Sequence, residues 1–309
     1  MEPMQHIPRR GFLRAFSASS VLGFPALLAA PKSTDVRIKE VKFGYEDYLY
    51  RTPIKFGGTP VDRVTLLNVD CVVETASGRS AKGFGSMPLG NIWAFPSKDM
   101  PYEVTLNAMK GLSERVAKIT ADYNETRHPV DINVTLEPLY LSAAEEESRR
   151  QKLKAPIPKL ATLVVASPFD AAIHDAFGKL HRRSAYDIYG SDLMTHDLSH
   201  YLGPEFKGEY LQQYVLKKPK SRMPLYHLVG ALDPITESDI QKRLNDNLPE
   251  TLPEWIEYSG LTHIKIKLNG DDLSWDVNRV LAVDRATTET QRKRGVKTWY
   301  YSADFNERC

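Results

Sequence analysis

The sequence predicts an α+β unit followed by a second unit of alternating strands and helices. In residues 35–76, β-branched and apolar residues alternate with polar ones, which is typical of antiparallel strands joined by glycine-containing turns. Helical periodicity begins at Tyr102 and recurs as far as Tyr189. After Pro224, short strand patterns alternate with longer helical patterns, which predicts βαβ units and a parallel sheet.

Two features of the first unit bear on its loops and helices. Residues 78–100 are rich in glycine, proline and aromatic side chains, so we expect an exposed loop that could serve binding. Ser167 followed by Pro168 predicts the start of a helix, because a capping hydroxyl precedes a proline in the first helical position. A small sheet followed by helices is an α+β arrangement.

The second unit is predicted to contain three strands separated by two helices. These elements are expected, in order, at residues 224–231, 236–248, 262–268, 274–293 and 297–306. Three βα repeats are few for a parallel sheet, so we expect the alternation to continue in a longer parent protein, or the unit to be a remnant. The chain is therefore divided into residues 1–30, 35–220 and 221–309.

The N-terminus resembles an export signal. Arg9 and Arg10 precede Phe12 and Leu13, and a mildly apolar stretch with small residues follows. A basic segment, an apolar segment and small residues form a signal peptide, and adjacent arginines are typical of the twin-arginine type. We expect export from a bacterial cell through the twin-arginine (Tat) machinery, to the periplasm or beyond. An ordinary amphipathic helix is the alternative, and the stretch is too short and polar for a membrane span.

The charge balance argues against a polyanionic partner. The formal net charge is +2, from 41 basic and 39 acidic residues. No dense block of lysine and arginine with interleaved aromatic residues is present in the sequence. We therefore expect no nucleic-acid partner.

Two predicted strands end in pairs of polar residues with one residue between them. Lys265 and Lys267 form the first pair, and Asp304 and Asn306 form the second. Side chains two residues apart on a strand share a face, and ligands of parallel α/β structures bind at the carboxyl ends of strands. The alternatives are that the lysines lie on the solvated face of an edge strand and that the acidic pair belongs to a turn or helix cap.

These residue types suit one kind of chemistry. Two ammonium groups held close together depress each other's pKa, which can leave one of them able to accept a proton. A carboxylate with neighbouring oxygen donors suits Mg²⁺. Together they match the abstraction of a proton next to a metal-bound carboxylate, where the metal stabilises the enediolate that forms.

The same segments resemble a known group of enzymes. "THIKIKLNG", residues 262–270, followed by "YSADFNERC", residues 301–309, is similar to the mandelate racemase and muconate lactonizing enzyme branch of the enolase superfamily. Residues 167–180 resemble the helix that leads into the barrel of that branch, and the stretch from Val36 resembles its capping domain. The resemblance implies an α+β capping domain followed by the first three βα units of a truncated TIM-type (β/α) barrel.

The resemblance also implies roles for the polar pairs. Lys267 would be the acid/base that removes or returns the α-proton of a small-molecule carboxylate substrate. Lys265 would contact the substrate carboxylate and lower the pKa of Lys267. Asp304 would be the first Mg²⁺ ligand, supported by Asn306. The implied reactions are racemisation or epimerisation, cycloisomerisation, and dehydration.

The family's two further acidic ligands and its opposing base have no counterpart in the 309 residues. We therefore expect this chain alone to bind metal weakly and not to turn over substrate. The alternative is a non-catalytic remnant or binding protein, which would form a homo-oligomer through an open sheet edge.

Specificity in this family is set by capping-domain loops at the barrel mouth. By position these are residues 50–58 and 85–96, in which Met87, Trp93 and Phe95 are candidates for the wall of a substrate pocket. The alternative is that these side chains pack the loop itself.

One histidine pair is a weaker candidate for a metal site. His196 and His200 would share a helix face, but the nearby Gly203 favours a loop, and no glutamate follows the first histidine as in zinc proteases. We expect these histidines not to bind metal.

Overall fold

The structure is a computed structural model that describes residues 30–56 and 59–305. The chain forms two compact units. The first comprises the described residues up to Glu46 together with Leu66–Leu89 and Leu106–Lys218, and the second comprises Asp47–Thr65, Gly90–Thr105 and the residues from Pro219 onward. The predicted signal of residues 1–30 lies almost wholly outside the described residues, as does Asn306, so both stay predictions.

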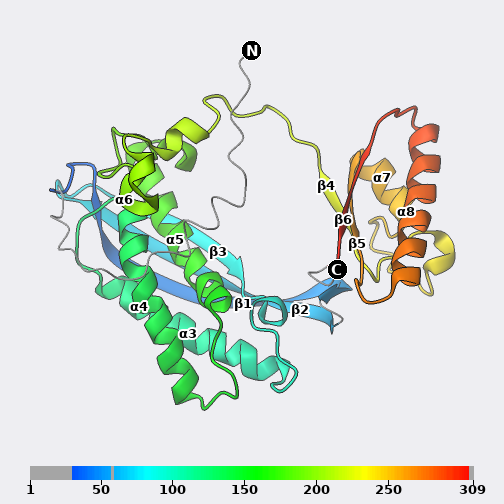
Figure 1. Ribbon diagram of the computed structural model, residues 1–309, viewed down its shortest axis with the longest axis horizontal. Helices are drawn as coiled ribbons and strands as arrows, with labels where there is room; N and C mark the ends of the chain where they lie inside the picture. Colours follow the sequence, from blue (N-terminus) through cyan, green and yellow to red (C-terminus); the bar gives the residue numbers. More distant parts are fainter. Residues whose placement is uncertain (1–29, 57–58, 306–309) are drawn as a thin grey trace. The chain divides into compact units, whose positions relative to one another are not determined.

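The first three strands that the structure describes form one sheet (Figure 1). Its strands are β1 (Val36–Phe56), β2 (Thr59–Thr75) and β3 (Ser80–Pro88), in the order β1-β2-β3. β2 and β3 pair antiparallel, with Leu67 opposite Met87. The strands predicted in residues 35–76 are confirmed, whereas their antiparallel pairing with each other stays a prediction. Residues 80–88, predicted as part of a loop, form a strand instead.

The glycines of β3 explain why this strand resembled a loop in sequence. A Cβ atom at Gly83 would lie 2.1 Å from the carbonyl oxygen of Ala172, and one at Gly85 would lie 2.0 Å from that of Pro168. Both contacted residues lie on helix α5 (Lys159–His181), which lies against β3 (Figure 1). The glycines are therefore needed for close backbone approach between strand and helix, and they do not mark a turn.

Helix α5 continues through the proline that was expected to start it. Pro168 lies inside the helix, so the predicted start at Ser167 is wrong. Proline has no N–H to donate to the carbonyl of Val164, and that oxygen instead accepts a hydrogen bond of 2.9 Å from the Ser167 hydroxyl. Among the described residues, α5 alone is long and apolar enough to cross a membrane, but most of it is buried inside the first unit, as in a core helix.

Other helices complete the first unit. They are α3 (Tyr102–Asp122), whose first turn belongs to the second unit, α4 (Pro129–Arg150) and α6 (Ser199–Leu202), with short 3₁₀ helices at Ala185–Asp187, Pro204–Phe206 and Leu211–Tyr214. His128 caps α4: its Nδ1 accepts from the backbone N–H of Val130 at 3.2 Å, and its Nε2 contacts the carbonyl of Ile188 at 3.1 Å. Burial lowers the pKa of His128 to about 4, which keeps the imidazole neutral and able to accept this bond.

The second unit contains a parallel sheet of the order β4-β5-β6. Its elements are β4 (Tyr226–Val229), a 3₁₀ turn (Glu237–Asp239), α7 (Leu252–Ser259), β5 (His263–Lys267), α8 (Leu273–Lys293) and β6 (Tyr300–Asp304), with the short α2 (Asn91–Ala94) also assigned to this unit. The predicted strands, their parallel pairing and the helix at 274–293 are confirmed. The described residues form three parallel strands and do not close a barrel.

The prediction of a helix at residues 236–248 is wrong. Asn245 and Asn247 have φ angles of 56° and 66°, in the left-handed region, so the segment cannot continue as a helix. The helix forms later, where Thr251 and Glu254 make a reciprocal capping box and a proline occupies the first turn.

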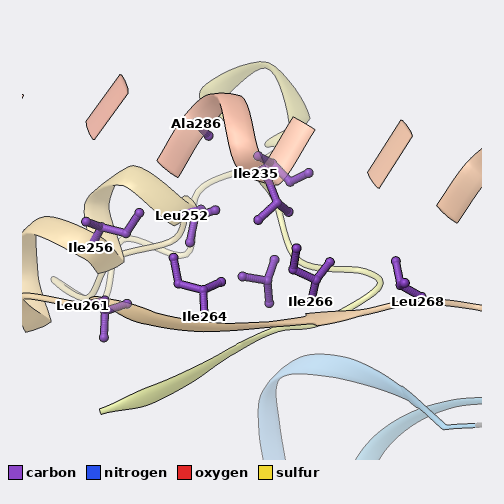
Figure 2. Packing of buried hydrophobic residues seen from close by; sticks show 10 residues of the cluster. Ile235, Leu252, Ile256, Leu261, Ile264, Ile266, Leu268 and Ala286 are labelled. Atoms are coloured by element: carbon purple, nitrogen blue, oxygen red, sulfur yellow. The ribbon is translucent and has the colours of Figure 1, made fainter. Parts of the chain in front are cut away.

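The apolar core of the second unit lies on one face of β5. Ile264 and Ile266 are 0% and 2% exposed and pack with Leu252 and Ile256 of α7 and with residues of α8. Figure 2 shows both isoleucine side chains pointing from the strand toward these helices. This face fixes the register of the strand, because a slip of one residue would exchange isoleucine for lysine in the core.

The contact between β3 and α5 can be tested with a glycine substitution. We expect Gly85→Ala to lower the free energy of unfolding by about 1–3 kcal/mol, because the added methyl group overlaps the helix backbone. The matched control is Gly44→Ala, since a Cβ atom at Gly44 meets no atom within 4 Å. Urea unfolding at constant m-value measures both changes. Equal stability of the two variants would contradict the close approach.

A buried carboxylate ties α3 to α4 and gives a second test. Glu147 is 1% exposed in its side chain and accepts hydrogen bonds from Arg150 (2.5 Å), Arg115 (2.7 Å) and Gln151 (2.6 Å). The bonds from Arg150 are the main cause that lowers the pKa of Glu147 from 4.5 to about 2. We expect Glu147→Gln to cost about 1–3 kcal/mol at neutral pH.

The pH dependence of this cost follows from the lowered pKa. The contribution of the Glu147 carboxylate is fully present above pH 4.5 and is lost as the pH falls toward about 2, so the difference between wild type and Glu147→Gln should shrink over that interval. Glu145→Gln is the control, because Glu145 is 72% exposed and 3.9 Å from Arg149. A difference that is independent of pH would show that the carboxylate charge does not stabilise the helix pair.

Candidate functional site

The two lysines and the aspartate predicted to form a site lie together in the second unit. Lys265 and Lys267 are on β5, and Asp304 ends β6, where it lies opposite Lys267 in the parallel register. The Nζ atom of Lys265 is 2.6 Å from Asp304 Oδ2, and that of Lys267 is 3.0 Å from the same oxygen. One carboxylate oxygen therefore receives both ammonium groups.

The strand alternation explains this arrangement. Ile264 and Ile266 face the core of the unit, so the side chains of Lys265 and Lys267 must emerge on the opposite face. Parallel pairing then brings the end of β6 beside the end of β5, which places Asp304 within reach of both lysines.

The loop that follows β5 is held by hydrogen bonds that its backbone N–H groups donate. The N–H of Leu268 donates to the carbonyl of Asp304 at 2.9 Å. The next two N–H groups, of Asn269 and Gly270, donate to the two carboxylate oxygens of Asp276 at 2.7 and 2.9 Å. Because Asp276 is 5% exposed and lies in the first turn of α8, it fixes the loop at the carboxyl end of β5.

The three side chains are partly shielded from solvent. The exposed fractions are 31% for Lys265, 12% for Lys267 and 23% for Asp304. Two positive charges and one negative charge leave the group with a net positive charge. The observed ion pairs show that both lysines can reach one carboxylate.

The described residues by themselves do not make a good magnesium site. Mg²⁺ is usually held by one or two carboxylates together with substrate oxygens and water. Asp304 offers one carboxylate here, and two ammonium groups already contact its Oδ2 and would repel a divalent cation. The predicted role of Asp304 as a metal ligand thus has no support from this arrangement.

The residues predicted to wall a pocket differ in exposure. Phe95 is 2% exposed, so its side chain is buried, and its predicted role in a pocket wall stays a prediction. Trp93, in α2, is 47% exposed, and Met87 lies on β3 instead of in a loop. The expected loop 50–58 is mostly strand, at the end of β1.

The sequence interpretation missed a residue beside the histidine pair. His196 and His200 stack, with ring centroids 4.0 Å apart, although His196 precedes α6 and does not share its helix. Asp131 of α4 lies next to them, with its Oδ1 3.1 Å from His196 Nδ1. Sixty-five residues separate the aspartate from the first histidine, so no local pattern could have joined them.

Comparisons with known proteins find similar chains among solved structures. No protein-family model and no curated protein sequence matches the chain at a significant level. Among solved structures, an enolase from Bradyrhizobium complexed with magnesium and mandelic acid has a TM-score of 0.49 at 15% identity, over 89% of this chain and 55% of its own. L-talarate/galactarate dehydratase from Salmonella typhimurium also has a TM-score of 0.49 at 15% identity, over 95% and 57%.

A third similar structure is a dipeptide epimerase from Enterococcus faecalis complexed with Mg and a dipeptide. Its TM-score is 0.47 at 14% identity, over 88% of this chain and 55% of its own. The chain spans about half of the length of these three structures.

The ion-paired lysines can be examined by chemical labelling. We expect acetic anhydride to modify Lys267 at least several-fold more slowly than Lys293, because Lys267 is 12% exposed and Lys293 is 68% exposed. Both lysines contact a carboxylate, so the comparison isolates burial. Mass spectrometry of peptides after short labelling times measures the rates. Equal rates would favour the alternative that the lysine pair lies on a solvent face.

Proposed function

We propose that Lys265, Lys267 and Asp304 belong to the proton-transfer site of an enolase-superfamily enzyme that acts on a small-molecule carboxylate. The observation that carries the proposal is the contact of both lysines with one carboxylate oxygen at the carboxyl ends of adjacent parallel strands. The resemblance of residues 262–270 and 301–309 to that superfamily supports it. The reaction class is racemisation or epimerisation, cycloisomerisation, or dehydration.

The least exposed lysine is the proposed acid/base. Lys267 in its neutral form takes the proton from the α-carbon of the substrate, and the electrons of the broken C–H bond pass into the carboxylate to give an enediolate. Protonation of the enediolate on the opposite face, by a group outside the described residues, would give the epimer, whereas loss of a protonated hydroxyl group from the neighbouring carbon would give dehydration. Transfer requires Asp304 to release Lys267, since the Nζ atom of Lys267 contacts the Asp304 carboxylate at 3.0 Å.

Lys265 is the proposed electrostatic partner. Its ammonium group lies 2.6 Å from the Asp304 carboxylate, which shows that it can hold a carboxylate on the same face as Lys267. A substrate carboxylate in contact with Lys265 would gain stabilisation as negative charge develops on its oxygens. Mg²⁺, which several structural neighbours contain, would stabilise the same charge if groups outside the described residues held it.

Hydrogen–deuterium exchange at the α-carbon tests the proposal. The full chain is incubated in D₂O with mandelate, with and without Mg²⁺, and the loss of the α-proton signal is followed by NMR. Exchange needs only proton abstraction and not complete turnover, so we expect exchange above the buffer rate, which Lys267→Ala lowers about 10²–10⁴-fold because the variant has no base at that position. Lys293→Ala is the control, since Lys293 is an exposed lysine of α8. Exchange by wild type that persists in Lys267→Ala would refute the assignment of the base.

A non-catalytic binding or remnant protein is the second candidate. It is favoured by the engagement of both ammonium groups with Asp304, because protonated lysines cannot accept a proton. This candidate predicts no exchange by wild type with any carboxylate offered, no gain in thermal stability on addition of Mg²⁺, and association of chains through an outer strand of the parallel sheet.

A further inference from the structure

A second cluster of polar side chains lies in the first unit, apart from the lysine site in sequence and in unit. Its members are Asp131, in the first turn of α4, His196, before α6, and His200, within α6. Each offers one ligand atom, and these atoms all lie within 4.8 Å of one another. No part of the proposed function uses these residues.

The loop that carries the histidines is organised locally. The carboxylate of Asp197 accepts from the backbone N–H of Ser199 at 3.0 Å and from that of Gly208 at 2.7 Å. The N–H of Leu198 donates to the carbonyl of Glu209 at 2.8 Å. The backbone on both sides of the histidine pair is therefore held in place without the help of the imidazoles.

The aspartate carries an unsatisfied oxygen. The side chain of Asp131 is 8% exposed, and its Oδ1 is occupied by His196 Nδ1 at 3.1 Å and by the Tyr201 hydroxyl at 2.5 Å. Its Oδ2 is buried and has no hydrogen-bond partner among the described residues. A buried carboxylate oxygen without a partner is costly, and a cation that also contacted Oδ2 would remove that cost.

The distances in the cluster suit a metal ion. Ligand atoms bonded to a tetrahedral metal at about 2.0–2.2 Å lie about 3.4 Å apart. The separation of His196 Nδ1 and Asp131 Oδ1, 3.1 Å, is close to that distance. The largest separation in the cluster is at most 4.8 Å, so binding needs a contraction of at most about 1.4 Å.

The two imidazoles need a small rearrangement. Their ring planes are 13° from parallel, so their in-plane lone pairs do not yet converge on one point. His200 is exposed, and the last torsion of a histidine side chain is broad, so a rotation of its ring is inexpensive. Binding of one ion by both imidazoles would require this rotation to bring a nitrogen of His200 toward His196 Nδ1 and Asp131.

We propose that Asp131, His196 and His200 bind a divalent transition metal of the Zn²⁺ class. Two imidazole nitrogens and one carboxylate favour such an ion over Mg²⁺, which prefers oxygen ligands only. Because three protein ligands leave a coordination position vacant and His200 faces solvent, the ion can also hold a water molecule. Tyr201 acts as a positioning residue, since its hydroxyl orients the Asp131 carboxylate. The bound ion joins the first turn of α4 to the segment that follows residue 195.

Calorimetric titration with Zn²⁺ alone tests the proposal. The full chain is stripped of metal with chelator and titrated in the presence of excess Mg²⁺. We expect one site in wild type that Mg²⁺ does not block, at least tenfold weaker binding in His200→Ala, and about 10–100-fold weaker binding in Tyr201→Phe. His263→Gln is the matched control, because His263 is a partly buried histidine of the other unit, on β5.

Three results would overturn the inference: absence of Zn²⁺ binding, equal affinity in wild type and His200→Ala, or equal loss of affinity in His263→Gln. Circular dichroism of His200→Ala verifies its fold, which an exposed side chain should not disturb. Co²⁺ added to wild type gives a second readout, since visible bands that shift on replacing His196 with glutamine report imidazole ligation directly. Because neither readout involves α-proton exchange, failure here leaves the proposed function untouched, and the reverse also holds.

Discussion

The burial of two isoleucines on one face of β5 is the constraint on which the second unit depends. Ile264 and Ile266 pack against α7 and α8. Because side chains alternate along a strand, Lys265 and Lys267 point to the opposite face. The hydrophobic core therefore sets the position of the charged groups. A strand without that core could slip in register and separate the lysines from Asp304.

The first unit rests on a different contact, in which backbone approaches backbone. Gly83 and Gly85 of β3 lie against Pro168 and Ala172 of α5, with no room for a side chain between them. Two residues of strand cover about 6.7 Å and four residues of helix about 6 Å, so the two glycines match one turn of the helix. The N–H of Phe84 donates to Asp175 Oδ2 at 2.9 Å, so the helix also satisfies a donor on the outer strand of the sheet.

The two candidate sites differ in what holds their charges. At the lysine site, opposite charges satisfy one another, and any chemistry must begin by breaking an ion pair. At the Asp131 cluster, one oxygen of a buried carboxylate lacks a partner, and two imidazoles stack beside it. The first arrangement is stable without a ligand, whereas the second would gain by binding a cation.

The sequence by itself determined the elements whose pattern is local. The strands β4, β5 and β6, the long helix α8 and the shared face of Lys265 and Lys267 follow from periodicity and from short-range spacing. The aspartate was placed beside the lysines because equivalent ends of neighbouring parallel strands meet at one edge. These inferences need only the geometry of single strands and their pairing.

Tertiary structure alone decided the rest. The glycines of residues 78–88 suggested a loop until α5 lay against them, and Pro168 stays inside a helix because Ser167 bonds the carbonyl that the proline leaves unpaired. Asp131 meets His196 across sixty-five residues of chain. In each case the deciding contact joins groups that only the packing of the chain brings together. A local sequence pattern carries no information about such contacts.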